Sequence, residues 1–110
     1  MALPGQFFDC MVLYLNQDEF DDRIADQLAG LSRMFAAAFR HRHPAMIADV
    51  ISELRLILAA PELDQSVIDH SVGATWVDWD ADDRMRGELR SVLATTLEEL
   101  AATSNVSKSA

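Results

Sequence analysis

Apolar side chains recur at three- and four-residue intervals along most of the chain, and this spacing constrains the fold most strongly. A helix turns every 3.6 residues, so such a spacing lines one helix face with apolar groups. The longest run predicts a helix from about residue 18 to His41, with this stripe: Phe20, Ile24, Leu28, Leu31, Phe35 and Phe39. Only residues 76–80 show the alternation of side-chain types that could indicate a strand, and no second strand-like run exists to pair with them. The sequence therefore predicts an all-α fold.

The segment before residue 16 predicts a short, mostly buried first helix. Phe7, Met11 and Leu15 follow one another at four-residue steps. Cys10, the only cysteine, lies among these apolar residues and is expected in the core, where a thiol is inert. A single cysteine also excludes an intramolecular disulfide.

Two prolines delimit the next helix. Proline is tolerated only in the first turn of a helix, so a new helix is predicted to begin at Pro44 and to run to about Ala60. Pro61 then ends it. This helix has few polar interruptions, and we expect it to be the central helix of the bundle.

Beyond Pro61 the pattern predicts two more helices joined by a loop. The first spans residues 63–72 and is expected to close on Gly73 in a left-handed conformation. A loop over residues 74–80 leads to the last helix, with Asp80 as its N-cap. Apolar periodicity ends before residue 104. We therefore predict one domain of about five helices over residues 1–103 and a disordered tail over 104–110.

The net charge of −9 over 110 residues repels nucleic acid and anionic membrane surfaces, so we expect direct binding to neither. The acids are clustered. Residues 16–26 contain five acids and one arginine, and residues 62–83 contain seven acids and no lysine or arginine. No apolar stretch is long enough to cross a bilayer, and no basic residue precedes Arg23, so neither a membrane span nor a secretion signal is predicted. We expect a cytoplasmic protein.

Some of these acids are explained as helix caps or dipole partners, but Asp69 and Asp78 lie outside any predicted first turn. Two tryptophans stand among the acids of the loop, and aromatic anchors within a charged rim are typical of protein-binding surfaces. A tryptophan in a small domain more often belongs to the core. Of the two, we expect Trp79 rather than Trp76 to be exposed. The candidate partner-binding residues are Asp21, Asp22, Asp26, Asp69, Asp78, Trp79, Asp80 and Asp82.

The sequence offers little catalytic chemistry. His41 and His43 are two residues apart, which places them on different helix faces, and no third ligand stands at a recognised spacing. We expect neither a metal nor a cofactor. Carboxylate pairs are abundant, so an enzyme that uses two of them stays open as a third interpretation, although no pair stands out.

Scattered positions over residues 3–100 carry a family resemblance. They are Leu3, Phe7, Phe8, Cys10, Tyr14, Gln17, Asp18, Ile47, Val50, Leu54, Ile57, Leu58, Pro61 and Leu63, followed by the tryptophan-bearing loop. In this order the chain resembles contact-dependent growth inhibition immunity proteins. The resemblance implies a small cytosolic antidote that binds the C-terminal toxin domain delivered by a neighbouring cell and blocks its active site. Many such toxins act on nucleic acid and carry basic clefts.

The leading hypothesis is therefore a non-enzymatic inhibitor that meets a basic toxin domain with its acidic surface. Opposite charge on the two partners speeds their association. The alternative is an acidic regulatory or scaffold domain that acts by homodimerisation, with the acids serving only to keep it in solution.

Overall fold

The computed structural model describes the backbone of residues 3–16 and 24–109 and the side chains within residues 3–16 and 27–102. Its elements are α1 (Gly5–Leu15), α2 (Ile24–Arg42), the 3₁₀ turn η2 (Pro44–Met46), α3 (Ile47–Ala59), α4 (Gln65–Thr75) and α5 (Asp83–Ser109). The described residues contain no strand, so the prediction of an all-α fold with about five helices is confirmed. The predicted start of the second helix falls on residues 17–23, which lie outside the described residues.

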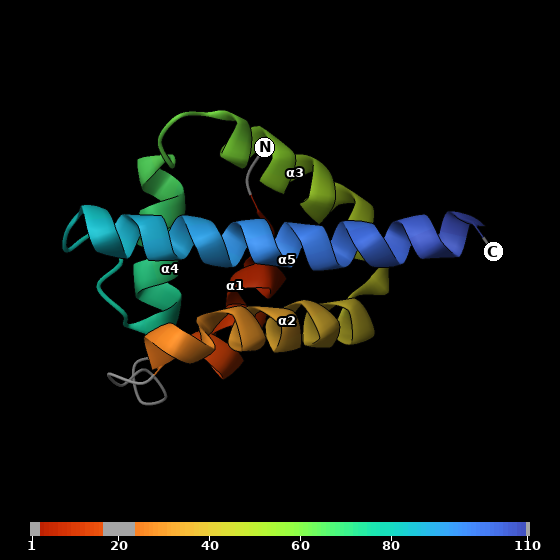
Figure 1. Ribbon diagram of the computed structural model, residues 1–110, viewed down its shortest axis with the longest axis horizontal. Coiled ribbons are helices and arrows are strands. Elements are labelled where there is room, and N and C mark those ends of the chain that lie inside the picture. The colour runs from red at the N-terminus through yellow and green to blue at the C-terminus, as the bar shows by residue number, and fades with distance from the viewer. Residues whose placement is uncertain (1–2, 17–23, 110) are drawn as a thin grey trace.

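The central helix is α5. In Figure 1 it runs along the long axis of the molecule, with α2 packed along one side and α3 along the other, while α1 packs against α2 and α4. Its residues Leu89, Leu93 and Leu100 have no exposed surface. The prediction that the helix after Pro44 is central is wrong. Only one face of α3 is covered, and Leu56 on its open face is 70% exposed.

Three phenylalanine rings hold α1 against α2. The ring of Phe7 makes edge-to-face contacts with Phe35, at 4.9 Å between ring centroids, and with Phe39, at 5.7 Å. All three side chains are fully buried. Aromatic pairs in this geometry add about 0.5–1.5 kcal/mol to the free energy gained from burial alone. A first helix that buries Phe7, Met11 and Leu15 is present as predicted, but its other face is open, with Leu13 48% exposed.

A single arginine fastens the turn between α3 and α4 to α5. The Nη2 atom of Arg90 donates hydrogen bonds to the carbonyl oxygens of Leu58, at 2.6 Å, and Ala60, at 2.9 Å. The last carbonyls of a helix lack partners within that helix, so the guanidinium supplies donors where α3 ends. Pro61 follows directly, as predicted.

We expect Leu54→Ala to lower the free energy of unfolding by about 2–5 kcal/mol, because truncating a buried leucine leaves a cavity. Leu54 has no exposed surface. Thermal or denaturant unfolding measures the loss. Leu56→Ala, on the same helix but at a largely exposed position, is the matched control and should change stability by no more than about 0.5 kcal/mol. Equal stabilities for Leu54→Ala and the wild type would contradict the packing of α3.

The C-terminal segment differs from the prediction of a disordered tail. α5 continues through the predicted tail to Ser109, and in Figure 1 its last turns project beyond the other helices. Once a helix exists, each added residue gains one backbone hydrogen bond, so a helix can extend past its apolar stripe. Apolar periodicity alone therefore marks where α5 is packed, not where it ends.

Candidate protein-binding surface

The two tryptophans have roles opposite to those predicted. Trp79 has no exposed surface, whereas Trp76 is 65% exposed. The indole Nε1 of Trp79 donates a hydrogen bond of 2.9 Å to the hydroxyl oxygen of Thr75, which satisfies its one polar atom inside the core. The expectation that Trp79 is exposed and contacts a partner is wrong. Trp76 is the exposed aromatic side chain of this segment.

Trp76 also ends α4, in place of Gly73. Its φ is 59°, in the left-handed region, and its N–H donates to the carbonyl oxygen of Val72 at 2.7 Å. Gly73 lies within the helix instead. A left-handed conformation costs a residue with a side chain about 1–2 kcal/mol, and residues strained in this way cluster at functional sites. Trp76 is therefore the strongest candidate for an anchor.

Side chains of residues 76–80 alternate between solvent and core without forming a strand. Trp76, Asp78 and Asp80 are exposed, while Val77 and Trp79 are buried. The loop predicted here is confirmed. A signal for the buried tryptophan was present in the sequence, because Trp79 follows the apolar Val77 in the same phase of the alternation.

Gln65 and Arg86 bind three of the acids around this loop. The side-chain amide of Gln65 donates to Asp69 at 2.9 Å and to Asp80 at 3.1 Å. Arg86 donates to Asp80 at 3.1 Å and also to Asp83. Hydrogen bonds from the guanidinium, first to Asp83 and then to Asp80, raise the pKa of Arg86. This network ties α4 to the first turns of α5, and no sequence motif had singled out either Gln65 or Arg86.

Two other aspartates cap helices. Asp64 accepts the backbone N–H of Ser66 at 2.9 Å at the start of α4, and this bond, followed by one from the Ser66 hydroxyl, lowers the pKa of Asp64. Asp82 accepts the backbone N–H of Met85 at 2.8 Å at the start of α5. The prediction that Asp80 caps the last helix is wrong, because α5 begins at Asp83 and the residue before it is Asp82.

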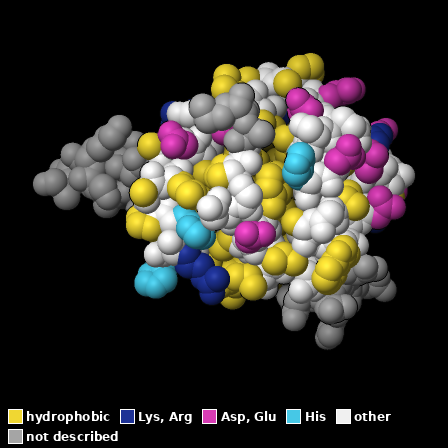
Figure 2. Space-filling view, turned by 180° about the vertical axis from the view of Figure 1, so that it is seen from behind, with side chains coloured by type: hydrophobic (Ala, Val, Ile, Leu, Met, Phe, Trp, Pro, Cys, Tyr) yellow, Lys and Arg dark blue, Asp and Glu magenta, His cyan; other side chains and the backbone are white. Residues whose placement is uncertain are grey.

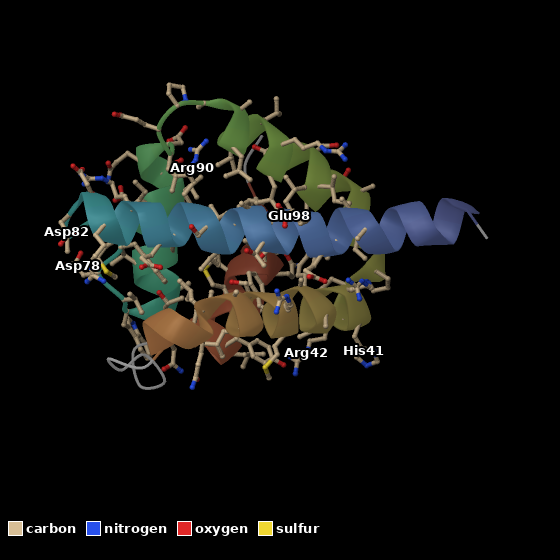
Figure 3. All side chains as sticks on the ribbon, in the orientation of Figure 1. His41, Arg42, Asp78, Asp82, Arg90 and Glu98 are labelled. Carbon is tan, nitrogen blue, oxygen red and sulfur yellow. The ribbon has the colours of Figure 1, made fainter. Side chains whose placement is uncertain are left out.

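Asp78 is the acid of this loop whose carboxylate makes no hydrogen bond or ion pair within the described part of the chain. It is exposed and lies two residues after Trp76. Figure 3 shows Asp78 and Asp82 at one end of the molecule, with His41 and Arg42 toward the other. We refer to Trp76, Asp78 and Asp80 together as the Trp76 surface.

Acidic side chains gather mainly over the end of the molecule that carries α4 on the face shown in Figure 2. The clustering of acids inferred from the sequence is therefore also visible on this face of the molecule. The candidate residues in the acidic cluster of residues 16–26 are Asp21, Asp22 and Asp26. Asp21 and Asp22 lie outside the described residues, and Asp26 lies in α2 with its side chain outside them. The first turn of α2 lies at the same end of the long axis as α4 (Figure 1). The part of Asp21, Asp22 and Asp26 in binding stays a prediction.

His70 is exposed, stacks on Phe8 with 5.3 Å between ring centroids, and places Nδ1 2.5 Å from the carbonyl oxygen of Ser66. Within the described residues, no three His, Cys, Asp or Glu side chains are placed to share a metal ion. None of the described helices combines the length and hydrophobicity needed to cross a membrane.

We expect Cys10 to resist thiol reagents in the native protein. The side chain is 3% exposed, and burial raises the pKa of its thiol, an effect that the charge of Arg42 only partly offsets. Fewer thiolates form at neutral pH, and reagents do not reach the sulfur. Mass spectrometry after labelling with iodoacetamide, with and without denaturant, measures this. Rapid stoichiometric labelling without denaturant would contradict the packing of α1.

No protein-family model matches this chain, and comparison with curated proteins and with solved structures found no match either.

Proposed function

We propose that this chain is an immunity protein that binds a toxin domain and blocks it. The supporting observation is Trp76, an exposed aromatic residue whose backbone adopts the strained left-handed conformation, two residues before the exposed Asp78. A large ring surrounded by polar groups is the usual form of a binding hot spot, because the ring is desolvated on contact while the rim excludes water. In the Trp76 surface, Trp76 supplies the aromatic ring, and Asp78 and Asp80 supply the polar groups.

The charge of this surface favours a basic partner. The net charge is −9, and the acids concentrate at the end of the molecule that carries Trp76. Carboxylates there would occupy positions that substrate phosphates take in a nucleic-acid-acting toxin, so inhibition would be steric and electrostatic. Attraction between opposite charges raises association rates by about 10–10³-fold, which suits an antidote that must capture its toxin quickly.

Co-expression tests the proposed function directly. The partner to use is the C-terminal domain of a large secreted protein encoded immediately before this chain. Cells that express this domain should survive only when this protein is present, and the two purified proteins should form a stable complex. Growth arrest despite co-expression, together with a concentration-dependent homodimer in light scattering, would favour the regulatory or scaffold alternative.

Removing charge from the Trp76 surface should slow association with the toxin domain by about tenfold, within the range expected for electrostatic steering. The variant is Asp78→Asn with Asp80→Asn, which keeps side-chain size and leaves the cap at Asp82 intact. Asp49→Asn with Glu98→Gln is the matched control, since it removes the same charge from exposed positions on α3 and α5. Surface plasmon resonance at low and high salt measures both association rates. If both variants associate at the same rate, the Trp76 surface does not guide the encounter.

A further inference from the structure

A groove of about 350 Å³ opens between the α3–α4 turn, α4 and α5. Pro61, Leu63 and Ile68 form an apolar wall, and Arg86 and Arg90 line the groove from α5. This volume lies at the lower end of the range for small-molecule sites, which combine apolar walls with a few polar groups. The groove therefore has the size and composition to accept a compact ligand.

Arg90 is a cation without a counter-ion among the described residues. Its Nη2 atom binds the two carbonyl oxygens at the end of α3, and its Nη1 atom is buried without a hydrogen-bond partner. Figure 3 shows Arg90 between α5 and the turn that follows α3. Partly burying a charge is unfavourable unless an opposite charge or further hydrogen bonds compensate it. Arg86, by contrast, already pairs with Asp80 and Asp83.

We propose that this groove binds a small monocarboxylate with a compact apolar body. A carboxylate accepts strong charge-assisted hydrogen bonds from a guanidinium, and a small rotation of Arg90 toward the groove would give Nη1 the acceptor that it lacks. The apolar body would pack on Pro61, Leu63 and Ile68. Glu62 and Asp83 also line the groove and repel multiply charged anions, so a single negative charge is favoured over phosphate.

This proposal is independent of the toxin-binding function and is tested without a partner protein. Benzoate is the probe, benzyl alcohol is its neutral counterpart, and inorganic phosphate is an anion without an apolar body. In a titration followed by ¹H–¹⁵N NMR spectra, benzoate should give saturable shifts of the amides at residues 62–68 and 83–90. A charge-assisted hydrogen bond contributes about 1.5–3 kcal/mol, so benzyl alcohol should bind at least about tenfold more weakly.

Phosphate should also bind at least about tenfold more weakly than benzoate. Equal binding of phosphate would indicate a general anion site, and equal binding of benzyl alcohol would indicate a purely apolar one. Either result overturns the proposal, as does benzoate binding that moves only amides elsewhere in the protein.

Two pairs of variants locate the site. Arg90→Gln should weaken benzoate binding at least about tenfold. Arg84→Gln is its control, because it loses the same charge from an exposed position on α5 that does not line the groove. Gly87→Leu places a bulky side chain in the groove and keeps the charge of Arg90, and a Cβ at Gly87 meets no other atom within 4 Å. It should abolish binding, and Gly87→Ala, which occupies far less space, should retain it.

The Gly87 pair keeps the test decisive if Arg90→Gln fails to fold. Dispersed amide signals like those of the wild type show that each variant is folded. A folded Gly87→Leu variant that binds benzoate as the wild type does would overturn the proposal.

Discussion

Replacing Trp79 with alanine should lower the free energy of unfolding by about 3–5 kcal/mol, the loss typical of truncating a buried aromatic side chain. Trp79 has no exposed surface, and its indole N–H binds the Thr75 hydroxyl. Its removal leaves a large cavity where α4 ends. Because small domains are stable by only about 5–15 kcal/mol, this loss should greatly lower the midpoint of urea unfolding, measured by circular dichroism.

The matched control is the other tryptophan. Trp76→Gly removes a side chain of the same size from a largely exposed position and places glycine, the residue best suited to φ 59°, at the end of α4. Relief of the left-handed strain should leave stability unchanged or raise it by up to about 1 kcal/mol. If Trp76→Gly destabilised the protein as much as Trp79→Ala, the assignment of core and surface tryptophan would be reversed.

Trp76→Ala should shorten the lifetime of the complex with the toxin domain by about 30-fold. An aromatic hot spot contributes about 2 kcal/mol or more, and each 1.4 kcal/mol changes an equilibrium constant tenfold. Contacts that form after the encounter act mainly on dissociation, so the association rate should change little. Surface plasmon resonance separates the two rates, and this variant complements the charge variant, which acts on association.

Met34→Ala is the control for loss of an exposed apolar side chain. Met34 is 54% exposed on α2, outside the Trp76 surface. Its removal should leave both rates unchanged. A Trp76→Ala variant that dissociates as slowly as the wild type would show that the partner binds elsewhere, while the survival test of the proposed function would still stand on its own result.

Much of the candidate surface could be predicted from the sequence, because charge density and the position of aromatic residues are properties of the chain itself. Asp78 and Asp80 are exposed, as expected, but the exposed tryptophan near them is Trp76 and not Trp79. The individual roles of the acids could not be predicted. Asp82 caps α5, and Asp80 is shared between Gln65 and Arg86, which lie 15 residues before it and six after it.

Local chemistry determined the helical architecture. Apolar spacing in α1, α2 and α5 and the breaks at Pro44 and Pro61 act over a few residues, so the sequence alone predicts the all-α fold and several helix boundaries. Tertiary structure decided which elements are covered. α5 is central because it packs against both α2 and α3. α4 extends past Gly73 to Thr75, whose hydroxyl accepts a hydrogen bond from Trp79 in the core. Burial depends on neighbours distant in sequence, so only the tertiary structure determined that Trp79 is buried and Trp76 is exposed.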